Sequence, residues 1–106
     1  KTDFKSGTFI KENGTTIPIN HKEIQFKAIK FWTSKKTTIT YPIQWQIIIP
    51  KLNINIEVNR RLNNQELNIH TPFPLSYWEG KCSVSGSHQG QAYIELVGYP
   101  QKKVLK

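Results

Sequence analysis

The alternation of apolar and polar residues with a period of two is the feature that most constrains the fold of this chain. It is cleanest from Leu52 to Val58, where every second residue is apolar and the residues between them are Asn or Glu. Successive side chains of a β-strand point to opposite faces, so this pattern predicts a strand with one buried and one hydrated face. No segment shows the spacing of an amphipathic helix. The chain is therefore predicted to be all-β.

The same period recurs in short runs that are separated by turn residues. Asn13-Gly14 is a strong hairpin signal, because both residues tolerate a positive φ, and it predicts that residues 7–11 pair with residues 15–19. Further strands are predicted at residues 23–32, 41–49, 66–70, 76–84 and 91–99. Some seven or eight short antiparallel strands predict a β-barrel, with a β-sandwich as the alternative. A barrel of ~8 strands is packed solid or holds one small ligand.

The length and the termini bear on domain organisation. The 106 residues are enough for a single domain with one core, spanning residues 1–106. The chain opens on polar sequence and contains no Met, which predicts a processed product or part of a longer polypeptide whose secretion signal lies upstream. No apolar run approaches the ~18–20 residues of a membrane-spanning helix.

The net charge of +8 raises the question of a nucleic-acid partner. The lysines are scattered along the chain, and arginine, the residue suited to bidentate phosphate and guanine contacts, occurs only at positions 60 and 61. No helix-turn-helix, RNP or zinc-finger pattern is present. A nucleic-acid partner is therefore not expected.

The residue types that serve as metal ligands and nucleophiles are sparse. The single Cys82 excludes an internal disulfide and a cysteine-based zinc site, and it is predicted to be a small buried hydrophobe. The spacing of His21, His70 and His88 does not match a metal site. The chain also lacks a nucleophile elbow and a phosphate-binding glycine loop, so neither a metal nor a cofactor is predicted.

Tyr77 and Glu79 form the leading candidate for chemistry. They share one face of a predicted strand, and Trp78 and Cys82 share the other. If the Tyr77 face lines a cavity, desolvation would raise the pKa of the Glu79 carboxyl and make it a general acid. If the Trp78 face is the core, Glu79 is exposed and its role is structural. The sequence leaves both readings open.

A second pair, Tyr93 and Glu95, repeats this geometry on the next predicted strand. The two carboxylates could form a general acid/base pair, or they could be anchored in a structural network. Trp45, on the most apolar predicted strand face, is the best candidate for a ligand wall. His88 lies in the glycine-flanked loop between the two Tyr/Glu strands.

Several short motifs, taken in order, resemble the C-terminal part of the AttH and carotenoid 1,2-hydratase family, whose members are described as predicted secreted hydrolases. The resemblance covers the last three-quarters of the chain. It implies a two-domain protein with a lipocalin-like β-barrel in each domain, in which this chain is most of the second domain and an N-terminal lipocalin-like domain is its partner. The motifs are Trp32-Thr33-Ser34, Tyr41-Pro42-Ile43-Gln44-Trp45, Ile49-Pro50, Gln65-Glu66-Leu67, Tyr77-Trp78-Glu79-Gly80, Val84-Ser85-Gly86 and the run from Tyr93 to Tyr99.

The resemblance also implies a function and a secreted or periplasmic location. Hydratases of this family act on apolar isoprenoid or polyketide-like substrates, and an acid beside a tyrosine protonates a double bond. The matching positions here are Glu79 and Tyr77 as catalytic residues. The expected function is binding of an apolar small molecule, with acid-catalysed hydration or hydrolysis only in the full-length protein; the alternative is a non-catalytic structural or interaction domain. The expected substrate-binding residues are Trp45, Trp78, His88, Tyr93 and Glu95.

Overall fold

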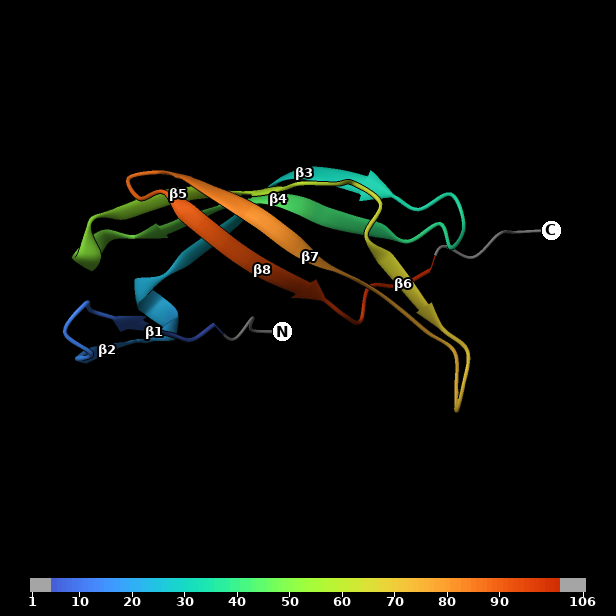
Figure 1. The fold of residues 1–106 in the computed structure, drawn as a ribbon, viewed down its shortest axis with the longest axis horizontal. Coiled ribbons are helices and arrows are strands. Elements are labelled where there is room, and N and C mark those ends of the chain that lie inside the picture. The colour runs from blue at the N-terminus through green and yellow to red at the C-terminus, as the bar shows by residue number, and fades with distance from the viewer. Residues whose placement is uncertain (1–4, 102–106) are drawn as a thin grey trace.

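The computed structural model describes residues 5–101, and every pair of neighbouring strands in it is antiparallel. The predicted all-β class is confirmed (Figure 1). The strands are β1 (Gly7–Ile10), β2 (Thr16–Ile19), β3 (Gln25–Thr33), β4 (Thr40–Ile49), β5 (Ile54–Arg60), β6 (Glu66–Ile69), β7 (Leu75–Gly86) and β8 (Gly90–Leu96).

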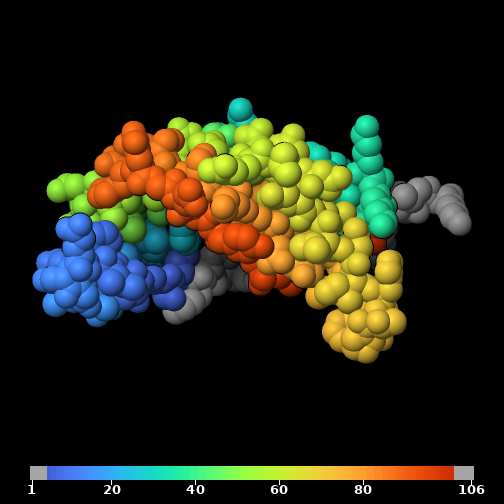
Figure 2. All heavy atoms as spheres, in the orientation of Figure 1, coloured from blue at the N-terminus to red at the C-terminus, as the bar shows by residue number. Residues whose placement is uncertain are grey.

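Strands β1 and β2 form the hairpin that the Asn13-Gly14 turn predicts. Gly14 has a φ of 87°, and the Lys11 amide donates to the Thr15 carbonyl at 2.8 Å across the turn. The hairpin is a two-stranded sheet of its own at one end of the molecule, where its residues are blue (Figure 1 and Figure 2). Ile19 at its end joins a small apolar cluster with Ile24, Ile49 and Ile54, and this cluster attaches the hairpin to the main sheet.

The main sheet contains the other six strands, and β7 is its centre. Strands β5 and β6 pair with the same edge of β7, since Arg60 lies opposite Cys82 and Glu66 lies opposite Trp78. Residues 61–64 leave the edge between them, and the Gln65 carbonyl accepts from the Glu79 amide of β7 at 3.3 Å. Strand β8 pairs with the other edge of β7, and β4 and β3 extend the sheet beyond β5.

The predicted closed barrel is not what the structure shows. Within residues 5–101 the outer strands β3 and β8 are not paired with each other, so the sheet stays open. It is nevertheless curved, because Leu96 of β8 packs in one cluster with Ile39 and Ile43 from the β4 side of the sheet. In Figure 1, β7 and β8 cross in front of β3 and β4.

The core lies on the concave face of this sheet, as the period of two requires. Trp45 lies opposite Val58, and Val58 lies opposite Val84, so the apolar residues of neighbouring strands share one face. Trp78 and Cys82 are completely buried there, which confirms the prediction for Cys82. Burial raises the pKa of the Cys82 thiol, as expected for a structural cysteine.

Within residues 5–101 the helical content is two single turns of 3-10 helix, η1 (His21–Glu23) and η2 (Pro50–Leu52). Asn20 and Glu23 form a capping box around η1, which orients the chain between the hairpin and β3. Among the residues that the structure describes, no helix is long and apolar enough to cross a membrane.

Candidate functional site

A hollow of about 320 Å³ opens on the concave face where β8 comes close to β3 and β4. We call it the apolar hollow. Its lining residues come from these three strands, which are far apart in the sequence but lie together because the sheet curves. They are Phe26 of β3, Trp45 and Ile47 of β4, and Ile94, Glu95 and Leu96 of β8.

Two aromatic rings form a fixed wall of the apolar hollow. The Trp45 indole nitrogen Nε1 donates a hydrogen bond to the Pro42 carbonyl at 3.0 Å. Phe26 meets this indole edge to face, with ring centroids 6.3 Å apart and ring planes at 78°. Phe26 remains 43% exposed, so its ring is available to a bound molecule.

The structure separates the predicted site residues between two faces of the sheet. Trp45 lies in the apolar hollow, and Glu95 borders it. The Trp78 face of β7 is the buried one, so Tyr77 and Glu79 project from the opposite face. Glu79 lies directly across from Glu95 in the β7–β8 register.

Tyr93 also lies on this outer face and is 65% exposed. Partial desolvation and the nearby Glu79 carboxylate raise the pKa of its phenol. Tyr77, Glu79 and Tyr93 thus lie on the hydrated side of the sheet, and Glu95 lies across from Glu79 at the border of the apolar hollow. Their predicted catalytic and substrate-binding roles stay predictions.

The remaining predicted residues, Trp78 and His88, do not line the apolar hollow. Trp78 is 0% exposed, and its Nε1 donates to the Asn63 carbonyl at 2.7 Å. His88 is exposed in the β7–β8 loop, where its Nδ1 lies 2.9 Å from the Ser87 hydroxyl. The Ser87 hydroxyl accepts from the Asn55 amide, so the contacts of His88 belong to the packing of a loop.

Sequence reasoning missed a carboxylate network centred on Glu66. Its Oε1 accepts from the Ser34 hydroxyl at 2.7 Å, and its Oε2 accepts from the hydroxyls of Thr37 at 2.6 Å and Tyr41 at 2.7 Å. The alternation in β6 could have indicated it, because this strand turns its polar residues Glu66 and Asn68 inward and its apolar residues Leu67 and Ile69 outward. An inward-facing carboxylate needs such partners.

These contacts set the charge states of the network. Partial burial acts to raise the pKa of Glu66, but hydrogen bonds from Thr37, Ser34, Tyr41 and Asn68 outweigh it and hold the pKa below its ordinary value of 4.5. Burial raises the pKa of the Tyr41 phenol, and its hydrogen bond to the carboxylate raises it further. Glu66 is therefore ionised and Tyr41 neutral at neutral pH.

A pH dependence of stability follows from the lowered pKa of Glu66. A carboxyl whose pKa is lower in the folded state adds stability above its unfolded pKa, and this stability is lost as the pH falls through the folded pKa. We expect the free energy of unfolding to decrease below about pH 4.5. Urea unfolding of the chain and of Glu66→Gln across this range checks it. Parallel pH profiles for the two proteins would contradict the role of Glu66.

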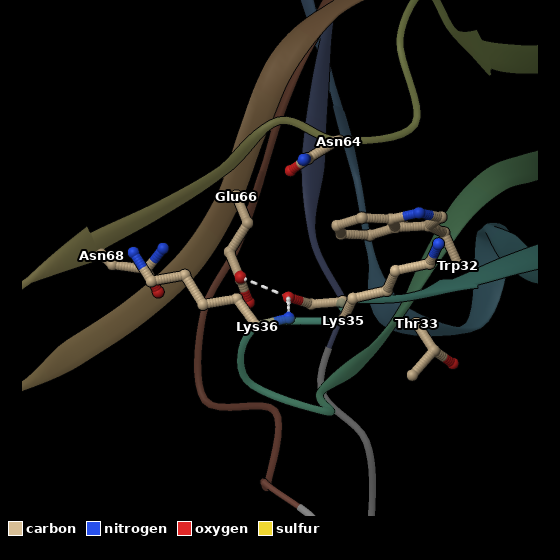
Figure 3. A pocket seen from close by; sticks show the side chains of 8 residues that line it. Trp32, Thr33, Lys35, Lys36, Asn64, Glu66 and Asn68 are labelled. Atoms are coloured by element: carbon tan, nitrogen blue, oxygen red, sulfur yellow. Dashed lines mark hydrogen bonds between the residues drawn. The ribbon is translucent and has the colours of Figure 1, made fainter.

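The network forms one wall of a second hollow, of about 570 Å³ (Figure 3). We call it the polar hollow. The dashed line that reaches Glu66 in Figure 3 marks its bond from the Ser34 hydroxyl. Its lining residues are Trp32, Thr33, Ser34, Lys35, Lys36, Asn64, Glu66 and Asn68. Within residues 5–101, no group of His, Cys, Asp or Glu side chains is arranged to hold a metal ion.

Comparisons with known proteins agree with this architecture. The model of the AttH-like family matches residues 1–99. The solved structure of a candidate AttH from Nitrosomonas europaea is similar with a TM-score of 0.82 at 23% identity, and the match covers 92% of this chain and 30% of that one. At this identity the likeness shows the fold. The chain thus spans 30% of the length of that protein, and no curated protein sequence matches it.

Proposed function

This chain belongs to the AttH-like family, and we propose that it binds an apolar small molecule in the apolar hollow. We propose further that its curved sheet is a lipocalin-like barrel wall and that it acts as one domain of a longer protein. The coverage of only 30% of the Nitrosomonas europaea chain supports the second part.

The observation that carries the binding proposal is the chemistry of the apolar hollow. Five of its six lining side chains are aromatic or aliphatic, and the indole nitrogen of Trp45 is already bonded to Pro42. Its volume of about 320 Å³ is near the lower end of the roughly 300–1,000 Å³ that small-molecule sites enclose. A small apolar ring therefore fits this hollow, and burial of its surface would drive the binding.

The proposal concerns binding and does not extend to turnover. Glu79 and Tyr77, the predicted acid and its neighbour, project from the face of the sheet opposite to the core. A molecule packed against Trp45 on the concave face is separated from the Glu79 carboxylate by the sheet. Of the predicted acids, only Glu95 borders the apolar hollow.

The neutral fluorescent probe N-phenyl-1-naphthylamine tests the proposal by titration. We expect Phe26→Ser to weaken its binding about tenfold, because an aromatic wall contact contributes about 1–1.5 kcal/mol. Phe31→Ser is the matched control, since Phe31 lies on the same strand and is 61% exposed but lines neither hollow. The control should leave the affinity unchanged.

Equal losses in Phe26→Ser and Phe31→Ser would contradict the proposal, because they would indicate nonspecific adsorption to exposed rings. Absence of saturable binding to the unmodified chain would contradict it as well. Circular dichroism of both variants establishes that they are folded before the affinities are compared.

A further inference from the structure

The polar hollow has a rigid wall, because the loop from Ser34 to Ile39 is fixed by its own hydrogen bonds. Ser34 is 2% exposed, and its hydroxyl oxygen accepts from the amides of Lys36 at 3.2 Å and Thr37 at 3.1 Å while it donates to Glu66. The loop therefore holds Lys35 and Lys36 at the hollow in a defined backbone geometry. Little ordering of the backbone is required for a molecule to bind here.

Trp32 supplies a flat aromatic wall to the same hollow. Its indole stacks on the Tyr41 ring, with centroids 6.3 Å apart and planes at 17°. Tyr41 is completely buried and its hydroxyl is bonded to Glu66, so the ring beneath Trp32 is immobile. Trp32 is only partly buried, and it lines the hollow together with Lys35 and Asn64 (Figure 3).

The polar groups of the hollow divide into satisfied and unsatisfied ones. The Glu66 carboxylate receives hydrogen bonds from four side chains, and Asn68 also accepts from the Ser76 hydroxyl. Among residues 5–101, in contrast, no ion pair joins Lys35 or Lys36 to a carboxylate, and the Asn64 carboxamide has no side-chain hydrogen bond. Two ammonium groups and one amide therefore remain to bind a further molecule.

We propose that the polar hollow is a binding site for a small organic anion that carries a flat ring. The ring would stack against Trp32, and the phosphate or carboxylate would lie at the ammonium group of Lys35, whose side chain extends toward the indole in Figure 3, with Asn64 as an additional donor. The Lys36 side chain extends the other way, toward Asn68, and would attract the anion from the opposite side of the hollow. This site is separate from the apolar hollow and is independent of the function proposed for it.

Charge favours an anion over a neutral or cationic ligand. The two lysines exceed the single carboxylate at the hollow, and the hydrogen bonds of Glu66 stabilise its charge within the protein. The net charge of +8 also attracts anions to the chain at long range, though without selecting a site. The preference for this hollow over other basic parts of the surface would come from the ring of the ligand, because Trp32 lines the hollow with a partly buried indole on which that ring can stack.

Phenyl phosphate, which carries both a ring and a charge, tests the proposal. Inorganic phosphate is the control that has the charge but no ring, and benzyl alcohol is the control that has the ring but no charge. The readout is the indole N–H signals of the isotope-labelled chain in NMR titrations. We expect phenyl phosphate to move the Trp32 signal in a saturable manner, and to bind about threefold to fivefold more tightly than either fragment, since stacking and charge contacts each add roughly 0.6–1 kcal/mol.

The double variant Lys35→Gln/Lys36→Gln should weaken phenyl phosphate binding at least about threefold, because it removes the charge contact at Lys35, which contributes about threefold, and the further attraction of the Lys36 charge. Lys11→Gln/Lys27→Gln is the matched control, because it removes the same charge from exposed positions outside the polar hollow. Equal losses in the two double variants would overturn the proposal by showing diffuse attraction to a basic chain. An unmoved Trp32 signal, or equally tight binding of benzyl alcohol, would overturn it too.

Discussion

Replacing Glu66 by leucine is expected to lower the free energy of unfolding by about 3 kcal/mol. The substitution leaves the hydroxyls of Ser34, Thr37 and Tyr41 without their acceptor, and each unpaired buried polar group costs about 1–3 kcal/mol. The network also connects the 34–39 loop and β4 to β6, which are distant in the sequence. Urea denaturation monitored by tryptophan fluorescence measures the change.

Glu95→Leu provides the matched control for Glu66→Leu. Glu95 is an exposed glutamate on β8, and a substitution at an exposed position usually changes the free energy of unfolding by no more than about 0.5 kcal/mol. Equal destabilisation by the two substitutions would show that the Glu66 network adds nothing specific. A smaller loss in Glu66→Gln than in Glu66→Leu is expected, because the amide oxygen still accepts hydrogen bonds.

Replacing Trp78 by alanine is expected to destabilise the chain by about 4 kcal/mol, the largest effect of any change considered. Trp78 is completely buried between neighbouring strands of the core, and a Trp-to-Ala change in a core costs roughly 3–5 kcal/mol through lost contacts and the cavity left behind. The Asn63 carbonyl also loses its donor. Calorimetry would record a much lower melting temperature.

Two further variants keep the Trp78 prediction informative if the alanine variant does not fold. Trp78→Phe retains a ring but loses the bond to Asn63, so a loss of about 1–2 kcal/mol is expected. Tyr93→Ala removes a ring from the exposed face of the adjacent strand and should cost much less. Similar stabilities of Trp78→Phe and the unmodified chain would argue against an important role for the indole hydrogen bond.

The strands could be predicted from the sequence because, in most of them, apolar residues on the buried face alternate with polar residues on the exposed face. The Asn13-Gly14 hairpin was found as β1–β2. The alternation from Leu52 to Val58 was found as β5, which starts two residues later, because Leu52 belongs to η2 and Asn53 has a left-handed φ of 55°. Closure could not be predicted this way. Whether β3 pairs with β8 depends on the curvature and register of the whole sheet, which no single strand pattern encodes.

The candidate sites show the same limit. Trp45 was found in the apolar hollow because its strand is apolar on one face, a property that the sequence displays directly. The direction of Glu79 depended on which face of β7 is the core, and Trp78 and Cys82 determine that only once they are packed. Glu66 was missed because its partners Ser34, Thr37 and Tyr41 are at least 25 residues away along the chain.

The central claim is that the apolar hollow beside Trp45 binds an apolar small molecule. The three tryptophans give it a direct test, since Trp32 lines the polar hollow, Trp45 the apolar hollow, and Trp78 is buried. Titration of the isotope-labelled chain with N-phenyl-1-naphthylamine should move the Trp45 indole N–H signal saturably and leave those of Trp32 and Trp78 in place. A stationary Trp45 signal while the probe binds would contradict the assignment of the apolar hollow as the binding site.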